Sequence, residues 1–146
     1  LAKRNRAAGQ KVFHNAMCSR CHRKGSEGYP IGPDLTHVAR RFDRASLLTE
    51  IVAPSQTIAE NYQTTVLKLT DNRTLAGQVV PNLDYREPAL QLAENPLHPD
   101  KLTKIPKSQI LSQSHAPTSL MPQGLLNLFT KDEVLNLLTW LEAPSN

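Results

Sequence analysis

The sequence predicts a mainly α-helical protein of 146 residues that carries an inserted small antiparallel β subdomain. Apolar residues recur at helical spacing near both ends of the chain, and the last segment begins with a helix-capping pattern. Between about residues 62 and 117, β-branched residues alternate with polar ones on both sides of a turn. We therefore expect one domain over residues 1–146, with the β-rich insertion at about 62–117.

Helices are expected on both sides of the insertion. The first covers Leu1–Asn15, where apolar and basic residues share a near-helical spacing. Asp43 is the expected N-cap of a second, short helix over Arg44–Val52. The clearest helix follows Thr130, because Thr130 and Glu133 form a capping box ahead of a leucine-rich segment.

Other segments have turn and strand patterns. Residues 23–36 contain three glycines and two prolines, which predict an irregular loop rather than a strand or helix. A hairpin is expected over residues 62–80, where two alternating segments flank an Asp-Asn turn. Two further short strands are expected at residues 89–92 and 101–105.

The distribution of charge argues against a nucleic-acid partner, and the hydropathy of the chain argues against a membrane span. The formal net charge is +4, but no run of five or more like charges occurs, and the few aromatic residues, 5% of the chain, are not interleaved with basic ones. We therefore expect no nucleic-acid partner. No apolar run approaches the ~20 residues of a membrane-spanning helix, so we expect no membrane span in this chain.

Both cysteines of the chain lie in the segment Cys18-Ser19-Arg20-Cys21-His22. A zinc site would need further ligands, and the other histidines show no paired spacing. A redox dithiol would follow a strand in a βαβ unit, whereas this motif follows a helical, basic segment. A disulfide between the two cysteines would close a very small loop and add little rigidity.

Cys-x-x-Cys-His is also the attachment motif of c-type haem. Two thiols at this spacing add to the two vinyl groups of the porphyrin, and the histidine that follows lies under the iron. Its other ring nitrogen then needs an acceptor that fixes the tautomer. A haem would also fill the interior of a chain with few aromatic residues. We therefore expect one covalently attached haem c, held by Cys18 and Cys21 and ligated by His22.

A low-spin electron-transfer haem needs a sixth ligand, and a thioether stabilises ferrous iron. The chain has two methionines. Met17 directly precedes Cys18 and cannot reach the opposite face of the ring, whereas Met121 lies in a proline-punctuated loop before the last helix. Met121 is therefore the candidate, with an ordinary core methionine as the alternative interpretation. His98 and His115 are rival ligands that we expect to face solvent.

Several motifs resemble a class I cytochrome c, in the same order along the chain. They are Gly9-Gln10-Lys11-Val12-Phe13, Cys18-Ser19-Arg20-Cys21-His22, Gly32-Pro33-Asp34-Leu35, Ser119-Leu120-Met121-Pro122 and the leucine-rich C-terminal helix. The segments GPDLTHVARRF, LLTEIVAPSQTIAENYQTTVLKLTDNRTLAGQVV and SLMPQGLLNLFTKDEVLNLLTWL resemble, more narrowly, the Pirellula/Verrucomicrobium-type haem-binding domains. Such domains commonly form the C-terminal part of large secreted proteins whose other domains look like propeller dehydrogenases.

The resemblance implies a role for each matching residue. Cys18 and Cys21 would carry the thioethers, His22 would be the proximal ligand and Met121 the distal ligand. The carbonyl of Pro33 would accept the Nδ1 proton of His22. The implied fold is that of class I cytochrome c, in which the N- and C-terminal helices cross, although the β insertion is absent from the small soluble carriers.

The expected function is electron transfer without catalysis. The chain would be a carrier or the haem domain of a larger oxidoreductase, and not itself an enzyme, because a His/Met pair saturates an iron that cycles between Fe(III) and Fe(II). The alternative is a ligand-binding or peroxidase-like haem domain with a labile sixth ligand. A non-haem Cys-x-x-Cys module is a third hypothesis.

The expected partners are redox proteins or a fused dehydrogenase domain. The basic residues Arg20, Arg23 and Lys24, beside the motif, would steer a partner with an acidic docking surface. Because c-type maturation takes place outside the bacterial cytoplasm, we expect the protein to be periplasmic or otherwise exported.

Overall fold

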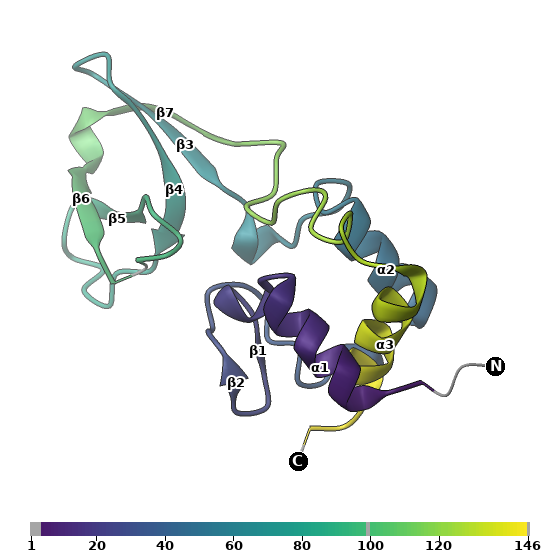
Figure 1. The fold of residues 1–146 in the computed structure, drawn as a ribbon. Helices are drawn as coiled ribbons and strands as arrows, with labels where there is room; N and C mark the ends of the chain where they lie inside the picture. The colour runs from purple at the N-terminus through teal and green to yellow at the C-terminus, as the bar shows by residue number, and fades with distance from the viewer. Residues whose placement is uncertain (1–3, 99, 146) are drawn as a thin grey trace. The chain divides into compact units, whose positions relative to one another are not determined.

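The computed structural model describes residues 4–98 and 100–145 and divides into two compact units (Figure 1). Three segments of chain make up the units: Leu1–Thr57 and Met121–Asn146 for unit 1, and Ile58–Leu120 for unit 2. The segment predicted as a β-rich insertion falls within unit 2. That the whole chain forms a single domain stays a prediction.

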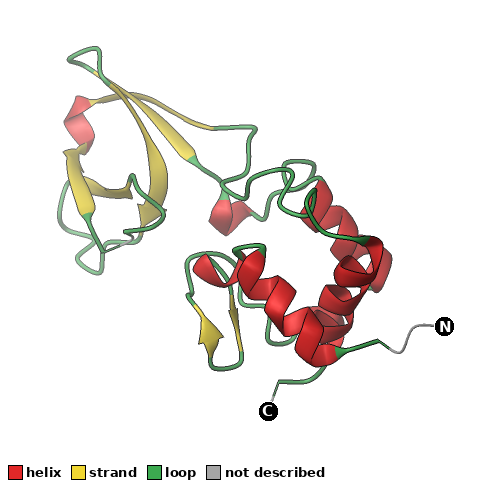
Figure 2. Cartoon of the chain, in the orientation of Figure 1, coloured by secondary structure: helices red, strands yellow, loops and turns green. Residues whose placement is uncertain are grey.

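Unit 1 contains the α-helices of the described residues (Figure 2). The short red segments of unit 2 in that figure are the 3-10 helices η3 (Glu60–Tyr62) and η4 (Lys107–Gln109). The α-helices are α1 (Arg6–Asn15), α2 (Arg44–Val52) and α3 (Lys131–Glu142). Each begins after a residue whose side-chain oxygen accepts a hydrogen bond from a backbone nitrogen of the first turn: Asn5, Asp43 and Thr130. The predicted starts at Asp43 and Thr130 are confirmed. The first helix begins at Arg6 rather than Leu1, and residues 1–3 lie outside the described residues.

Helices α1 and α3 pack together at a glycine. A Cβ atom on Gly9 would overlap the backbone of Asn136 and lie 2.7 Å from Cβ of Trp140, so only a hydrogen atom fits there. The ring centroids of Phe13 and Trp140 lie 4.6 Å apart. The backbone nitrogen of Asn5 also donates to the side chain of Asn136 at 3.0 Å. The first and last helices are thus joined by backbone packing, an aromatic pair and a hydrogen bond.

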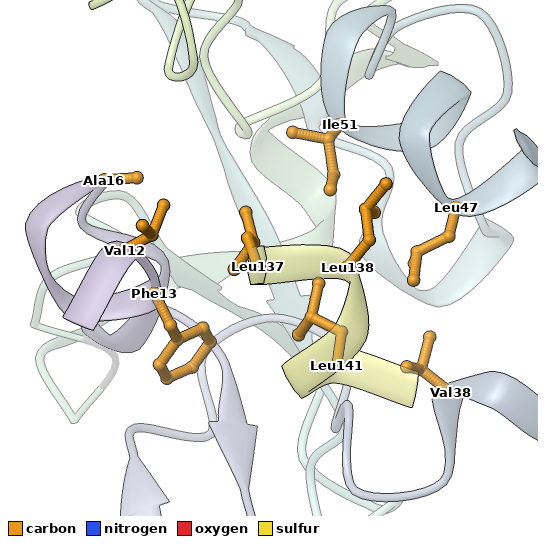
Figure 3. Close-up of a cluster of buried hydrophobic side chains, with 9 residues drawn as sticks. All are labelled: Val12, Phe13, Ala16, Val38, Leu47, Ile51, Leu137, Leu138 and Leu141. Atoms are coloured by element: carbon orange, nitrogen blue, oxygen red, sulfur yellow. The ribbon is translucent and has the colours of Figure 1, made fainter. Parts of the chain in front are cut away.

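The hydrophobic core of unit 1 lies between these helices (Figure 3). Its buried residues are Val12, Phe13, Ala16, Val38, Leu47, Ile51, Leu137, Leu138 and Leu141. Phe13 is the one aromatic side chain among them. The buried core therefore depends mostly on valine, leucine and isoleucine side chains, each of which contributes roughly 1.5–3 kcal/mol when fully buried.

Part of the loop predicted at residues 23–36 is a small antiparallel sheet. Strands β1 (Arg23–Lys24) and β2 (Glu27–Gly28) pair with each other, so the prediction of a wholly irregular loop is wrong. Gly25 has a φ of 61°, in the left-handed region that glycine adopts readily, and it reverses the chain between the strands. Strands of two residues are too short for an alternating pattern, so the sequence did not predict them.

Unit 2 contains a five-stranded antiparallel sheet with the strand order β6-β5-β4-β3-β7. The strands are β3 (Thr65–Leu69), β4 (Thr74–Val80), β5 (Ala89–Ala93), β6 (Leu102–Pro106) and β7 (Ile110–His115). Its buried core consists of Leu67, Leu69, Leu92 and Ile105.

Within the described residues, no helix combines the length and the apolar character needed to cross a membrane.

The predicted fold class, mainly α with a small β subdomain, is wrong. The described chain has three α-helices, a five-stranded sheet with its own core and a second, two-stranded sheet, so strands are as prominent as helices. The sequence predicted the hairpin and two strands of unit 2, but not β7. Residues 111–115 of β7 are exposed and mostly polar, because β7 pairs only with β3 at the edge of the sheet.

The close approach at Gly9 gives a stability prediction. The variant Gly9→Ala should lower the free energy of unfolding by roughly 1–3 kcal/mol, because the added methyl group forces α1 and α3 apart. Urea denaturation of the holoprotein measures this change. The control is Ala7→Ser at an exposed position of α1, which should have little effect. Equal stability of Gly9→Ala and wild type would contradict the packing described here.

Candidate cofactor-binding site

The Cys-x-x-Cys-His motif folds as a tight turn directly after α1. The 3-10 helix η1 covers Cys18–Arg20, and the backbone nitrogens of Cys21 and His22 both donate to the carbonyl of Cys18, at 3.2 and 2.9 Å. Met17 precedes this turn with a φ of 65°, a left-handed conformation that is common after the end of a helix. The two thiols and the imidazole therefore come from a single compact turn.

Both thiols are free, and burial suppresses their ionisation. Desolvation raises the pKa of Cys18 to about 11. It also raises the pKa of Cys21, although the charge of Arg20 opposes the shift. A redox dithiol instead needs a lowered pKa, since the thiolate is the attacking species. The direction of both shifts argues against the redox-dithiol hypothesis.

The ring of His22 is oriented by a backbone carbonyl. Its Nδ1 atom lies 2.7 Å from the carbonyl oxygen of Pro33, and because a carbonyl only accepts, Nδ1 carries the proton. Desolvation lowers the pKa of His22, and the bond to Pro33 opposes that shift without reversing it. The imidazole is therefore neutral at neutral pH, and its lone pair lies on Nε2, where a metal can bind.

Gly28 and Gly32 make room for His22 because they have no side chain. A Cβ atom on Gly32 would lie 2.9 Å from Cε1 and 3.2 Å from Nδ1 of the His22 ring. A Cβ atom on Gly28 would overlap the carbonyl of His22. The backbone nitrogens of Ile31 and Gly32 donate to the carbonyl of Cys21 at 3.0 and 2.6 Å, which ties the loop before Pro33 to the motif.

Met121 belongs to unit 1 and packs, half-buried, against the same hydrophobic core as Cys18. The other half-buried apolar residues against this core are Leu35, Phe42, Leu48, Leu126, Phe129, Leu135 and Trp140. Met17 is 51% exposed, and His98 and His115 are exposed residues of unit 2. Met121 thus shares apolar surroundings with the motif, and its role as an iron ligand stays a prediction.

Lys24 is buried, which corrects the expectation that it would form a basic docking face with Arg20 and Arg23. It is 4% exposed, its Nζ donates to the carbonyl of Ala143 at 2.8 Å, and it lies 5.3 Å from the centroid of the Trp140 ring. Desolvation lowers the pKa of its ammonium group. Arg20 and Arg23 are exposed. Of the three basic residues, only the arginines are available to a partner.

A polar cluster with no counterpart among the predicted site residues connects α1, the motif and β2. Nδ1 of His14 lies 3.0 Å from Oγ of Ser19, and Nε2 lies 3.6 Å from a carboxylate oxygen of Glu27. Gln10 donates to the other carboxylate oxygen of Glu27 at 2.5 Å. The spacing of Gln10 and His14, four residues apart on one helical face, was the available signal. The cluster anchors the middle of the motif.

The described residues contain no group of three or more His, Cys, Asp or Glu side chains that could hold a metal ion. A structural zinc site draws four ligands from such side chains, so the part of the chain described here does not supply one. A haem iron takes four ligands from the porphyrin ring. It therefore needs at most two protein side chains, and the role of His22 as one of them stays a prediction.

Residues 6–71 match the Cytochrome c family model. The matched segment contains the Cys-x-x-Cys-His motif and Pro33 and ends before Met121. No curated protein matches the chain. The match covers less than half of the chain and supports a cytochrome c domain; proteins of that family bind haem and transfer electrons. The narrower Pirellula/Verrucomicrobium type is not confirmed and stays a prediction.

The cofactor of a cytochrome c domain is covalently bound haem c with its iron. The residues of this chain fit that group. Both thiols of the Cys-x-x-Cys-His turn are neutral, a neutral imidazole is oriented by Pro33, and Cys18 packs against the apolar core of unit 1. Gly32 leaves the His22 ring room to keep this orientation.

The contact between Gly32 and the His22 ring can be tested directly. In Gly32→Ala the new methyl group should displace the ring and weaken its bond to Pro33, at a cost of roughly 1–3 kcal/mol in unfolding free energy. The haem absorption spectrum should change as well. Asp43→Ala is the control, because it removes the N-cap of α2 and lowers stability without touching His22 or α1. A spectrum of Gly32→Ala identical to that of Asp43→Ala would contradict the expected displacement.

Proposed function

We propose that this chain is an electron-transfer domain whose single haem c is attached through thioethers at Cys18 and Cys21 and ligated by His22 and Met121. The observation that carries the proposal is the 2.7 Å hydrogen bond between Nδ1 of His22 and the carbonyl of Pro33, within a segment that matches the Cytochrome c family. This bond leaves Nε2 as the metal-binding atom of a ring that is neutral and held in one orientation.

The bond to Pro33 also affects how His22 binds iron. Donation from Nδ1 to a carbonyl increases the electron density on Nε2, which makes the imidazole a stronger ligand. It also restricts rotation of the ring about its bond to Cβ. A ligand held in one orientation changes little between oxidation states, which lowers the reorganisation that accompanies electron transfer.

Met121 is the proposed sixth ligand because its surroundings suit a thioether. It packs half-buried on the core that Cys18 also contacts, and the loop that carries it leads into α3, whose start is fixed by the capping box at Thr130. A thioether is a soft donor that stabilises the ferrous state and raises the reduction potential. The apolar neighbours of Met121 also restrict the access of water.

The proposed mechanism is transfer of one electron from a donor protein to an acceptor protein. Haem supplies the one-electron Fe(III)/Fe(II) couple when it is bound. The side chains of this chain would hold that group: Cys18 and Cys21 through thioethers, and His22 and Met121 as the two protein ligands of its iron. An iron held by both residues would have no open position for a substrate, so the proposed domain is a carrier and not an enzyme.

Two measurements test the proposal as a whole. Colour that remains with the protein after extraction with acidified acetone demonstrates covalent haem, and its loss would contradict attachment at Cys18 and Cys21. The oxidised protein should also show the weak far-red absorption of a methionine–iron bond. A ligand-binding or peroxidase-like haem is the second candidate, and prompt binding of carbon monoxide by the reduced wild-type protein would favour it.

Exchange of the proposed sixth ligand should move the reduction potential. Met121→His should retain the haem but have a markedly lower potential than wild type, because imidazole stabilises ferric iron better than a thioether does. Redox titration measures the shift. Met121→Ala should bind carbon monoxide promptly when reduced. An unchanged potential in Met121→His would show that Met121 is not the ligand, and Met17→His is the matched control at an exposed methionine.

The partner surface is proposed to include the exposed arginines beside the motif. Arg20 lies within the Cys-x-x-Cys-His turn and Arg23 directly follows His22, so both are close to the proposed haem attachment. Positive charge at this position favours an acidic partner, and the attraction is screened by salt over a Debye length of about 8 Å at physiological ionic strength.

The salt dependence of electron transfer tests this surface. Oxidation of the reduced protein by the anionic hexacyanoferrate(III) should slow as ionic strength rises, and Arg20→Gln combined with Arg23→Gln should lower the rate a few-fold and flatten the salt dependence. Arg86→Gln, an exposed arginine of unit 2, is the control. A rate that does not respond to ionic strength would contradict electrostatic steering.

The location and wider context follow from the same chemistry. Covalent haem attachment takes place outside the bacterial cytoplasm, so the proposed location is the periplasm or another exported compartment. The proposed electron donor or acceptor is a redox protein or a dehydrogenase domain fused to this one. Fractionation of cells that produce the protein, followed by haem staining, tests the location.

A further inference from the structure

Lys24 is a buried lysine that the proposed function does not use. Lysine is almost never fully buried unless its charge is compensated, because removing an ammonium group from water is costly. At 4% exposure, Lys24 is one of three polar or charged residues that are buried in the described chain, together with Thr64 and Thr65. Its position, two residues after His22, suggests a function in the site.

The Lys24 side chain connects β1 to the end of α3. Its Nζ donates to the carbonyl of Ala143, the C-cap residue of α3, at 2.8 Å. The same ammonium group lies 5.3 Å from the centroid of the Trp140 ring, within the range of a cation–π interaction. Both contacts favour a cation. The C-terminal end of a helix carries partial negative charge, and the face of an aromatic ring attracts a cation.

The backbone on each side of Lys24 holds the loop that contains Pro33. The nitrogen of Leu35 donates to the carbonyl of Arg23 at 2.8 Å. The nitrogen of Gly25 donates to Oγ1 of Thr36 at 2.9 Å. The residues before and after Lys24 are therefore both bonded to the segment that directly follows Pro33.

These contacts form one continuous path from α3 to the imidazole. It runs from Ala143 through the Lys24 side chain to β1, from β1 through two hydrogen bonds to residues 35 and 36, and from there to the carbonyl of Pro33. That carbonyl accepts the proton of His22 Nδ1 at 2.7 Å. A shift of β1 would thus move the acceptor that orients the His22 ring.

We propose that Lys24 is a positioning residue for His22: by fastening β1 to the C-terminal end of α3, it holds the loop whose Pro33 carbonyl orients the imidazole. The inference rests on the proposed function, in which His22 binds the haem iron. Lys24 itself touches neither the imidazole nor the carbonyl of Pro33 in this path. An apolar side chain could fill the same volume, but it would leave the buried carbonyl of Ala143 without this donor.

The test is Lys24→Met, which keeps an unbranched side chain and removes the donor and the charge. In the reduced holoprotein, hydrogen exchange of the His22 Nδ1 proton, followed by NMR, should be about tenfold faster than in wild type. Exchange of the Leu35 and Gly25 amides should accelerate to a similar extent. The reduction potential is a poorer measure, because loss of a cation and a weaker His22 hydrogen bond shift it in opposite directions.

A control variant separates positioning from a general loss of stability. Thr130→Ala removes the N-cap at the other end of α3 and lowers stability, but it should leave the His22 proton exchange unchanged. Thr36→Val removes one of the two hydrogen bonds that join β1 to the loop, so it should also accelerate the exchange, and adding it to Lys24→Met should have little further effect.

Two results would overturn the inference: unchanged exchange in Lys24→Met, or equal acceleration in Thr130→Ala. If Lys24→Met does not retain haem, Thr36→Val is the deciding variant. Unchanged exchange of the His22 Nδ1 proton in Thr36→Val would then contradict the proposed path. A different observation, prompt binding of carbon monoxide by the reduced wild-type protein, would contradict the proposed His/Met ligation. Amide exchange of Leu35 and Gly25 can still be compared in that case, because it does not require Met121 on the iron.

Discussion

The packing of α1 against α3 at Gly9 is the constraint on which unit 1 depends. Because α1 leads directly into the Cys-x-x-Cys-His turn, the position of α1 determines where both thiols lie. Helix α3 supplies Leu137, Leu138 and Leu141 to the core on which Cys18 and Met121 pack. The absence of a side chain at one position of α1 therefore lets the attachment motif and the candidate sixth ligand share a single apolar core.

The orientation of His22 results from local and distant contacts together. The local turn places the imidazole, but Pro33 provides the acceptor, Gly32 leaves the space, and Lys24 links their loop to α3. A short motif can therefore specify which residues bind a haem without specifying how the ring is turned. The orientation is a property of the folded unit, because these contacts come from separate segments of the chain.

The sequence predicted the features that depend on neighbouring residues. The N-caps at Asp43 and Thr130 and the first hairpin of unit 2 are signalled within a few positions. The role of Pro33 came from a family resemblance rather than from any local pattern. Burial of Lys24 could not be predicted, since its acceptor, Ala143, is far away in the sequence. Strand β7 was missed for a related reason: its exposed residues form a strand through pairing with β3, not through their own alternation.

Unit 2 separates Met121 from His22 in the sequence, yet this long separation adds little to the entropic cost of bringing the two proposed ligands together. The entropic cost of closing a loop grows only with the logarithm of its length, by roughly 0.6 kcal/mol for each doubling. Unit 2 also buries its own apolar residues, Leu67, Leu69, Leu92 and Ile105, between its own strands. Its sheet therefore needs neither haem nor the core of unit 1 to remove these side chains from water. In the proposed function, by contrast, haem is attached to unit 1 through Cys18 and Cys21. Loss of haem should therefore weaken unit 1 before unit 2.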